Sequence, residues 1–322
     1  MGKSDIKKAH TLIARILALE EFKPLIALLG LFIASSILSP YFLTLYNQRI
    51  LLLQAAPLTL LALGESMIIL MGSIDLSPGS TMALAGIVAA VAHISWGLDL
   101  GGAIVIGLAT GALVGFINGL LVTKAKIPSF VATLAALVAG RGMVLIITHG
   151  EPIVGLTKFK VFTEDVAFLP LMVWIFIIFT IFNYVLLKHT KVGVEIYAIG
   201  GNEEAARYAG INADLIKLMV FTVAGIYYAI AGLMMNARLE VAYPWTGWGY
   251  ELDAIAAAVL GGIQLTGGVG SPIGPAMGAY MLTLITNVLI LLGVEPFYQW
   301  VVKGAVLAAA ATALTRGLKY VK

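Results

Sequence analysis

Long apolar runs, separated by short polar or glycine-rich segments, make up most of this chain. A helix needs roughly 20 apolar residues to cross the hydrocarbon core of a bilayer, so the runs predict about ten membrane spans. The expected spans cover residues 24–42, 50–71, 79–95, 101–122, 127–148, 167–187, 218–236, 252–265, 273–292 and 297–314. The pattern therefore predicts an all-α, polytopic helical membrane protein with its membrane domain over residues 24–315.

Two segments that contain glycine and proline break the apolar pattern, at residues 72–80 and 261–272. The Ile-Asp-Leu-Ser of the first echoes the Ile-Gln-Leu-Thr of the second. Matched breaks in two halves of a chain are typical of transporters built from internal repeats, in which irregular backbone lines a cavity. The echo thus indicates a possible internal repeat. A broken or re-entrant helix is an alternative to a full span at 252–265, and residues 72–78 leave the same question open.

Basic residues are distributed unevenly between the two sides of the expected spans. An even number of spans places both termini on one side, and that side, with residues 188–217, carries fourteen of the 20 Lys and Arg residues and leaves six elsewhere. The positive-inside rule assigns this side to the cytoplasm. We therefore expect a cytoplasmic leader at 1–23, a cytoplasmic tail at 316–322, and outer loops at 151–166 and 239–251.

The polar segment at 188–217 contains the pattern of a short, capped helix. Asn202 favours the N-cap position, and Glu203 and Glu204 follow in the first turn, where carboxylates complement the helix dipole. Gly210 is a natural stop after the last turn. A short helix outside the bilayer predicts contact with a soluble partner. The candidate residues are Gly200, Gly201, Asn202, Glu203, Glu204, Ala205, Ala206, Arg207 and Gly210.

The composition excludes several classes of protein. Of all residues 60% are hydrophobic and 11% are charged, whereas soluble domains carry about 25% charged residues. The net charge of +3 is too small to indicate binding of nucleic acid. The chain has no Cys, and its four His are scattered, so the sequence predicts no disulfide, metal site, cofactor or catalytic constellation. Gly2-Lys3-Ser4 lacks the glycine-rich loop of a Walker A motif, so any ATPase that drives this protein is a separate chain.

Ionisable side chains inside membrane spans are costly and usually face the bundle interior or a pathway. The embedded ones expected here are Glu65, Asp75, Arg141 and Asp253. The candidates for a translocation path or gate are Glu65, Asp75, Ser77, Arg141, Gln264 and Thr266. Alternatives are that Asp75 caps the third span, that Arg141 reaches out to the membrane surface, or that Glu65 and Arg141 pair. A chain of acidic residues suited to proton relay does not occur, which argues against a proton-driven carrier.

A glycine stripe runs along one face of the fourth span. It consists of Gly107, Gly111, Gly115 and Gly119, and Gly270, Gly274 and Gly278 repeat the spacing near the ninth span. Such stripes let two helix backbones approach closely in lipid. Packing inside the bundle is the favoured interpretation, and a subunit interface is the alternative.

Four blocks of this sequence resemble the permease subunit of ATP-binding-cassette sugar importers of the ribose/xylose type. The blocks are residues 72–80, 193–210, 250–257 and 261–274, and the resemblance extends over about residues 51–314. Ser73 stands where the family more often has Gly, and Glu65 brings a charge where the family is typically uncharged. These departures leave the resemblance intact, and Glu65 becomes a candidate determinant of the substrate.

The resemblance implies a dimeric permease of ten helices in a prokaryotic plasma (inner) membrane. Cytoplasmic ATPase subunits and an extracytoplasmic sugar-binding protein would complete the complex, and the sugar would cross by alternating access. Residues 202–209 would form a coupling helix on the ATPase. The outer-loop residues Tyr243, Trp245, Trp248 and Glu251 become candidates for docking of the binding protein, with an interfacial aromatic belt as the alternative.

Other functions remain in view at this point. A permease of the same superfamily for nucleosides or branched-chain amino acids would keep the fold and the coupling. A secondary carrier or a channel would instead transport in liposomes without ATP. An integral membrane enzyme lacks support, because the chain shows no nucleophile with a matching base.

Overall fold

The structure is a computed structural model that describes residues 22–317. The expected leader at 1–23 and tail at 316–322 lie almost entirely outside these residues. The helices are α2 (Phe22–Leu38), α3 (Leu45–Leu70), α4 (Pro78–Ile94), α5 (Leu100–Thr123), α6 (Ser129–Thr148), η1 (Thr157–Phe162), α7 (Leu171–His189), α8 (Lys191–Gly201), α9 (Glu203–Tyr208), α10 (Ala213–Leu239), α11 (Tyr250–Leu260), α12 (Gly274–Leu291) and α13 (Pro296–Gly317). The strands are β1 (Ile153–Val154), β2 (Asp165–Val166), β3 (Leu169–Pro170) and β4 (Val241–Ala242).

Six of the described helices are long and apolar enough to cross a membrane: α3, α5, α6, α7, α10 and α12. α2 and α4 are also apolar but shorter. The strands are two residues long and lie in loops. The prediction of an all-α, polytopic membrane protein is therefore confirmed, whereas the count of ten spans stays a prediction.

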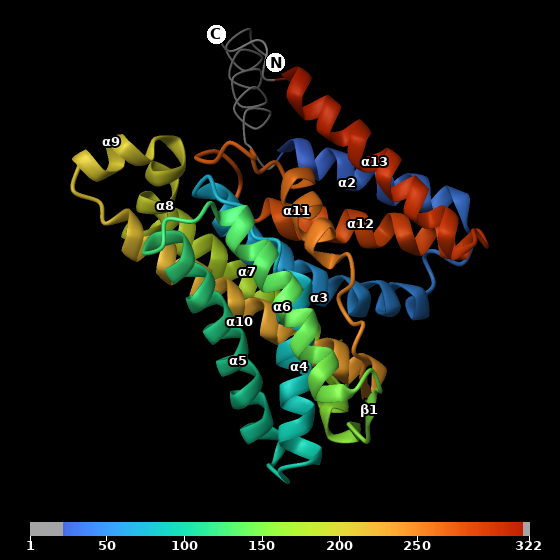
Figure 1. The fold of residues 1–322 in the computed structure, drawn as a ribbon. Helices are drawn as coiled ribbons and strands as arrows, with labels where there is room; N and C mark the ends of the chain where they lie inside the picture. Colours follow the sequence, from blue (N-terminus) through green and yellow to red (C-terminus); the bar gives the residue numbers. More distant parts are fainter. Residues whose placement is uncertain (1–21, 318–322) are drawn as a thin grey trace, which may run out of the picture.

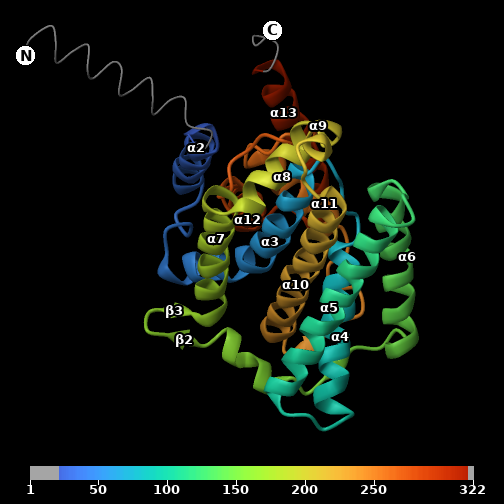
Figure 2. The same cartoon turned by 90° about the vertical axis from the view of Figure 1, so that its left-hand side faces the viewer.

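The molecule has two distinct ends (Figures 1 and 2). α8 and α9 lie at one end, together with the start of α2 and the end of α13. The turn between α4 and α5 lies at the opposite end, as does β1. β1 pairs antiparallel with β4, with Ile153 opposite Ala242, so the two expected outer loops meet at this second end. We call these two ends the α9 end and the β1 end.

α3 and α10 form the centre of the bundle. In their most apolar 18-residue windows 83% and 72% of residues are buried, against 22% in α5, α6 and α7. The outer helices expose large apolar side chains such as Leu113 and Ile146. A soluble protein would bury such stripes, so these helices are suited to contact with lipid.

α5 and α10 pack backbone against backbone through the glycine stripe. A methyl group on Gly111 would overlap the carbonyl of Gly225 on α10, and a methyl group on Gly225 would overlap the carbonyl of Gly111. Gly115 approaches the Phe221 carbonyl in the same way. Packing inside the bundle is confirmed for this stripe, and the alternative of a subunit interface there is wrong. In the second set, Gly274 and Gly278 pack against α11, while Gly270 lies before α12 begins.

Both glycine-containing segments interrupt the helices. α3 ends at Leu70, and the chain turns through residues 71–77 before α4 begins. α11 has only 11 residues, and irregular backbone follows it to residue 273. Gly262, Gly267 and Gly268 adopt positive φ angles there, which side chains with a Cβ rarely tolerate. The broken-helix alternative for the run at 252–265 is therefore confirmed.

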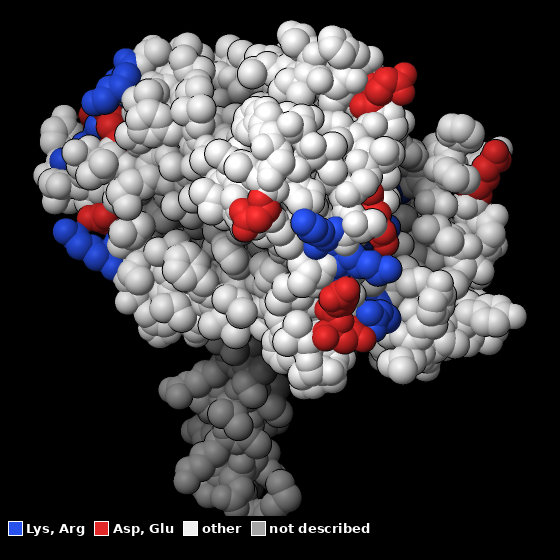
Figure 3. Space-filling view, turned by 90° about the horizontal axis from the view of Figure 1, so that it is seen from below, with Lys and Arg blue, Asp and Glu red and all other residues white. Residues whose placement is uncertain are grey.

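The β1 end presents a mostly uncharged surface with a few groups of acidic and basic side chains (Figure 3). Ion pairs account for several charges near this end, including Arg49 with Asp165 at 2.5 Å and Lys160 with Glu240 at 3.6 Å. Exposed ion pairs of this kind contribute little stability, about 0–1 kcal/mol each. They nevertheless tie the loop at 151–166 to α3 and to the end of α10.

Candidate functional site

α9 is capped at both ends by the residues that the sequence indicates. The Asn202 side chain accepts a hydrogen bond from the Ala205 amide at 2.9 Å. At the other end Gly210 has a φ of +87°, and the Ile211 amide donates to the Ala206 carbonyl at 3.0 Å. Glycine suits this position because a Cβ is strained at such a φ. The prediction of a short, capped helix is confirmed.

A chain of ion pairs fastens α9 to the bundle. Glu203 accepts hydrogen bonds from Arg207 at 2.8 Å and from Lys217 on α10 at 2.5 Å. Arg207 also pairs with Asp214 in the first turn of α10, and Lys126 pairs with the same carboxylate at 2.8 Å. Lys126 lies in the turn between α5 and α6, so this ionic network joins three parts of the chain.

Glu203 titrates differently from a free side chain. Burial alone would raise its pKa, but the hydrogen bonds from Lys217 and Arg207, with their positive charges, outweigh burial. The net effect lowers the pKa of Glu203 below its ordinary value. The carboxylate therefore stays ionised, and the network stays intact, well into the acid range.

Glu204 and Tyr208 form the outward face of α9. Tyr208 is 85% exposed, and its hydroxyl donates to the Glu204 carboxylate at 3.5 Å. Ala206 on the opposite face is buried. Of the three charged candidates on α9, Glu203 and Arg207 form ion pairs within the chain. Glu204 is the acidic residue of α9 that faces outward.

Four glycines bring the end of α8 against both helix breaks. A methyl group on Gly200 would overlap the Leu70 carbonyl and would lie 2.5 Å from the Gly268 amide nitrogen. The Gly268 amide itself donates to the Leu70 carbonyl at 2.9 Å. A methyl group on Gly267 would lie 2.7 Å from the amide nitrogen of Gly72. We call this contact of Gly72, Gly200, Gly267 and Gly268 the glycine junction. One of its members, Gly200, lies at the end of α8, just before α9 in the chain.

The path candidates of the second break lie beside the glycine junction. The backbone amide of Gln264 donates to the Val269 carbonyl at 3.1 Å, which closes a turn in the break. Thr266 is exposed, and its carbonyl lies 3.7 Å from the position of a Cβ on Gly72. Both residues thus belong to the irregular backbone at the α9 end.

The path candidates of the first break lie in a buried polar cluster. Glu65 accepts hydrogen bonds from the Asp75 amide at 3.1 Å and from the Tyr228 hydroxyl at 3.2 Å. Asp75 accepts from the amide of Ser77, the N-cap residue of α4, at 2.6 Å. Asn118 on α5 donates to the Ser77 hydroxyl at 3.0 Å. All five side chains are at most 1% exposed.

This cluster stabilises irregular backbone inside the bundle. Thr133 on α6 accepts from the Leu76 amide at 2.9 Å, and Ser129 accepts from the Ile74 amide at 3.1 Å. Non-helical backbone at membrane depth requires such partners because no lipid group can supply them. In this conformation Glu65 and Asp75 therefore hold the break together rather than face an open path.

Arg141 turns toward the loop before α11. Its guanidinium donates to the Thr246 carbonyl at 2.7 Å and lies 5.6 Å from the ring centroid of Trp248. A methyl group on Gly79 would contact both the Glu251 carboxylate and the Arg141 guanidinium. The alternative that Glu65 and Arg141 pair is wrong, because Glu65 is bonded within the buried cluster.

The structure thus brings together residues that the sequence assigned to two different roles. Arg141 was a path candidate, whereas Trp248 and Glu251 were docking candidates. Trp245 packs edge-on against Trp248 with ring centroids 5.6 Å apart, and Tyr243 lies exposed before them in the same loop. The cluster is positioned by α6, by the start of α4 and by the first turn of α11.

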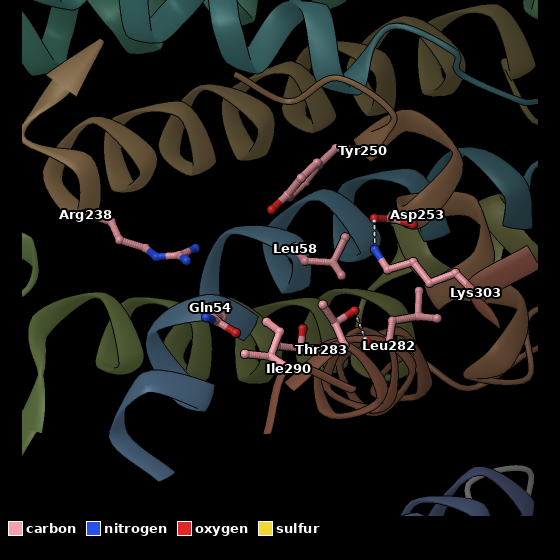
Figure 4. Close-up of a pocket in the computed structure, with 10 residues that line it drawn as sticks. Gln54, Leu58, Arg238, Tyr250, Asp253, Leu282, Thr283, Ile290 and Lys303 are labelled. Atoms are coloured by element: carbon pink, nitrogen blue, oxygen red, sulfur yellow. Dashed lines mark hydrogen bonds and ion pairs between the residues drawn. The ribbon is translucent and has the colours of Figure 1, made fainter. Parts of the chain in front are cut away.

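A polar cavity of about 210 Å³ lies between α3, α10, α11, α12 and α13 (Figure 4). Lys303 and Asp253 form an ion pair of 3.0 Å at one side of it. Among its lining residues the sequence analysis singled out Asp253 alone. The other lining residues come from five separate elements, so no local sequence pattern connects them. The one signal in the sequence that pointed to this cavity was the presence of charged residues within apolar runs. Its lining consists of Gln54, Leu58, Arg238, Tyr250, Asp253, Leu282, Thr283, Thr286, Ile290 and Lys303.

The described part of the chain offers no metal centre. Groups of three or more His, Asp or Glu side chains that could hold a metal ion do not occur among these residues. The candidate functional features among these residues are a surface helix held by ion pairs, two helix breaks in contact with each other, and a cavity lined with hydrogen-bonding groups.

Comparison with known proteins places the chain in a family. Residues 49–311 match the family described as "Branched-chain amino acid transport system / permease component". The chain is 41% identical over 306 residues to the ribose import permease protein RbsC of Escherichia coli (strain K12), covering 91% of this chain and 92% of RbsC. It is 33% identical over 332 residues to the xylose transport system permease protein XylH of Haemophilus influenzae, covering 84% of this chain and 88% of XylH.

A further relative is the L-arabinose transport system permease protein AraH of Escherichia coli (strain K12). The two chains are 36% identical over 298 residues, which cover 90% of this chain and 89% of AraH. No solved structure matches the chain. The relatives are named as permeases of transport systems, so the chain is a transporter rather than an enzyme. The chain therefore belongs to this permease family and, within it, to the ABC sugar permeases of the ribose/xylose type.

Proposed function

We propose that this protein is the membrane-spanning subunit of an ATP-driven importer. It receives a small sugar from an extracytoplasmic binding protein and is driven by separate ATPase subunits that bind α9. The observation that carries the proposal is the continuous contact from the outward face of α9, through the glycine junction, to both helix breaks. Two copies of this chain, or this chain and a related permease, would form the path between them.

The ionic network makes α9 suitable for transmitting force. A helix of six residues has little stability alone, because helix formation starts with a costly first turn. Here Glu203 and Arg207 tie it to α10, so a push on Glu204 or Tyr208 moves the bundle rather than unwinding the helix. Closure of two ATPases would bring two such helices together and rock the two bundles.

The glycine junction would carry this motion to the breaks. Gly200 and Gly267 leave no room for a side chain, so a displacement of α8 must displace the backbone that it touches. The break at 71–77 leads into α4, and the break after α11 leads into α12. Alternating access would then follow from movement of α4 and α11 against the central helices.

We also propose the membrane in which the chain lies and its orientation there. The α9 end would face the cytoplasm, since it carries most of the basic residues of the polar segments. The chain would lie in the plasma (inner) membrane of a prokaryote with about ten membrane helices, which are the six long ones, α2, α4, α13 and the short, broken α11. Both termini would be cytoplasmic, and the β1 end would face the binding protein.

The proposed cargo is a monosaccharide or a similar small polyol. The relatives above are named for import of ribose, xylose and L-arabinose. The permease path candidates are Glu65, Asp75, Ser77, Arg141, Gln264 and Thr266, of which the first three are buried in this conformation. A path along them would require α4 to move away from α5 and α10.

Reconstitution tests the proposal. The permease is placed in nanodiscs with the ATPase and the sugar-binding protein encoded beside it, and ATP hydrolysis is measured with and without the sugar-loaded binding protein. Glu204→Arg reverses the outward charge of α9 without touching the ionic network. Lys191→Glu is the matched control, because it reverses an exposed charge at the far end of α8.

We expect the loaded binding protein to stimulate ATP hydrolysis, and we expect Glu204→Arg to lower that stimulation by roughly tenfold while Lys191→Glu retains it. Full stimulation of the Glu204→Arg variant would remove α9 as the coupling surface. Sugar flux in liposomes without any ATPase would instead establish a secondary carrier.

A further inference from the structure

We propose that the cavity of Figure 4 is a binding site for one neutral monosaccharide within the permease itself, at which the cargo pauses during transport. The inference rests on the proposed function, because it assumes that the cargo is a small sugar. It assigns a binding role to residues of α3, α10, α11, α12 and α13 that neither the sequence pattern nor the relatives indicate.

The size of the cavity suits a small ligand. A volume of about 210 Å³ corresponds to roughly seven water molecules at about 30 Å³ each. Pockets for drug-sized ligands hold roughly 300–1,000 Å³. One sugar ring with its hydroxyl groups fits such a space.

The polar lining offers both donors and acceptors, as a polyol requires. Thr283 and Thr286 donate their hydroxyl hydrogens to carbonyls within α12, at 2.9 and 3.1 Å, so their oxygens remain as acceptors. Asp253 uses one carboxylate oxygen for Lys303 and retains the other. Gln54 supplies an amide with both a donor and an acceptor.

Arg238 supplies the strongest free donors. Its guanidinium extends toward the cavity, on the side to which the Tyr250 hydroxyl points (Figure 4). Among the described residues it forms no ion pair, unlike Lys303, which is paired with Asp253. Arg238 is partly buried in the last turn of α10, and the hydroxyl oxygens of a sugar are acceptors that its guanidinium can bind. Arg238 and Lys303 against Asp253 give the lining a formal net charge of +1, so the choice of a neutral ligand follows from the proposed sugar cargo and not from charge.

Apolar side chains complete the lining. Leu58, Leu282 and Ile290 cover part of the wall, and the Tyr250 ring borders the cavity. Carbohydrates have apolar C–H faces as well as hydroxyl edges, so a site with a few polar groups in an apolar wall suits them.

The position of the cavity connects it to the proposed transport machinery. Tyr250 and Asp253 line it from the first turn of α11, while Glu251 between them lies near Arg141 and Gly79 on another side. At its other end α11 packs against Gly274 and Gly278 of α12, next to the second break. Motion passed to that break would therefore shift the cavity wall and change its affinity for the sugar.

The test measures sugar binding without the binding protein. The complex of permease and ATPase in nanodiscs is titrated with radiolabelled D-ribose and D-xylose, and bound label is counted by scintillation proximity. Thr283→Val with Thr286→Val removes two acceptor oxygens and keeps the side-chain shape. Thr110→Val on α5 is the matched control, because Thr110 makes the same bond to its own helix but lies outside the cavity.

We expect saturable binding of at least one of the two sugars, a loss of roughly tenfold in the double Thr variant, and no loss in the Thr110→Val control. Arg238→Gln should weaken binding similarly. In the complete importer, the double variant should retain ATPase stimulation by the loaded binding protein and lose most sugar uptake, which separates failure of this site from failure of the proposed function.

Three results would overturn the inference. One is the absence of saturable binding to the unaltered complex. Another is wild-type binding and uptake in the double Thr variant. A third is displacement of the sugar by inorganic phosphate at equal concentration, which would make the cavity an anion site, such as one for a lipid phosphate.

Discussion

Glu203 has two roles at the start of α9. Its position in the first turn favours the helix, as a carboxylate near the positive end of the dipole. Its partner Lys217 then ties the helix to α10, and Arg207 on α9 does the same through Asp214. The first role is local and readable from the sequence, whereas the second depends on α10 lying beside α9.

The lowered pKa of Glu203 predicts how acid affects α9. A carboxylate whose pKa is lower in the folded state stabilises the fold above its unfolded pKa, near 4.3, and loses this contribution as the pH falls through the folded value. We therefore expect amide protection of residues 203–208 to be equal at pH 7 and pH 6 and to fall below about pH 4. Hydrogen exchange in nanodiscs, corrected for the intrinsic pH dependence of exchange, measures this protection.

Glu203→Gln is the control for that experiment. It keeps the shape of the side chain but removes its charge, so protection should be lower at neutral pH and should change less in acid. An unchanged acid profile in this variant would show that another group controls α9.

Arg141 illustrates the limit of reasoning at the residue scale. A basic residue within an apolar run signals a special environment, and the sequence analysis singled it out for that reason. Its partners, the Thr246 carbonyl and the Trp248 ring, are about a hundred residues further along the chain. Only the packing of α6 beside the loop before α11 selects these partners over Glu65.

Among the elements, α8 and the two breaks form the part on which the coupling proposal depends. α8 brings Gly200 to the end of α3, where space for a side chain is absent. Gly201, the next residue, has nothing within 4 Å of the position of a Cβ. The two neighbouring glycines therefore differ in packing: a side chain at residue 200 would collide with backbone, whereas one at residue 201 would not.

Substitution at these two positions tests the glycine junction. Gly200→Ala must displace backbone atoms, and overpacking of this kind typically costs about 1–3 kcal/mol. We expect a lower Tm and a lower sugar-stimulated ATPase rate for Gly200→Ala, and values within about 0.5 kcal/mol of the unaltered protein for Gly201→Ala. Calorimetry and ATPase assays on the assembled complex provide both quantities. Equal behaviour of the two variants would remove the junction from the coupling path.

At the scale of the whole molecule, the β1 end is the surface that we propose faces the binding protein. Its loops at 151–166 and 239–251 are joined by the β1–β4 pair. Trp245 and Trp248 pack against each other in the loop at 239–251, and the Arg141 guanidinium lies over the Trp248 ring. Docking and an aromatic belt remain two explanations for these side chains, and they predict different results.

Replacement of single tryptophans distinguishes the two explanations. Trp248 and Trp96 are both 59% exposed, and Trp96 lies in the turn between α4 and α5 at the same end. If the loop docks the binding protein, Trp248→Ala should weaken capture of the loaded binding protein roughly tenfold, while Trp96→Ala has no effect. Surface plasmon resonance on nanodiscs measures capture. Equal small effects of both variants would favour the aromatic belt.

The sequence alone determined the features that depend on neighbouring residues. Apolar runs predict membrane helices, because the bilayer requires about 20 apolar residues in succession. Asn202 and Gly210 set the ends of α9, because capping involves backbone groups only a few residues away. The glycine-containing breaks after α3 and α11 were visible for the same reason.

The tertiary structure decided which of these features touch. It placed Gly200 against both breaks, assigned the glycine stripe of α5 to α10, and separated Glu65 from Arg141. It also assembled the cavity from five elements between Gln54 and Lys303. A sequence pattern records the period of each helix but not its rotation or its neighbours. Those are set by packing of whole helices, in which each close contact depends on all the others.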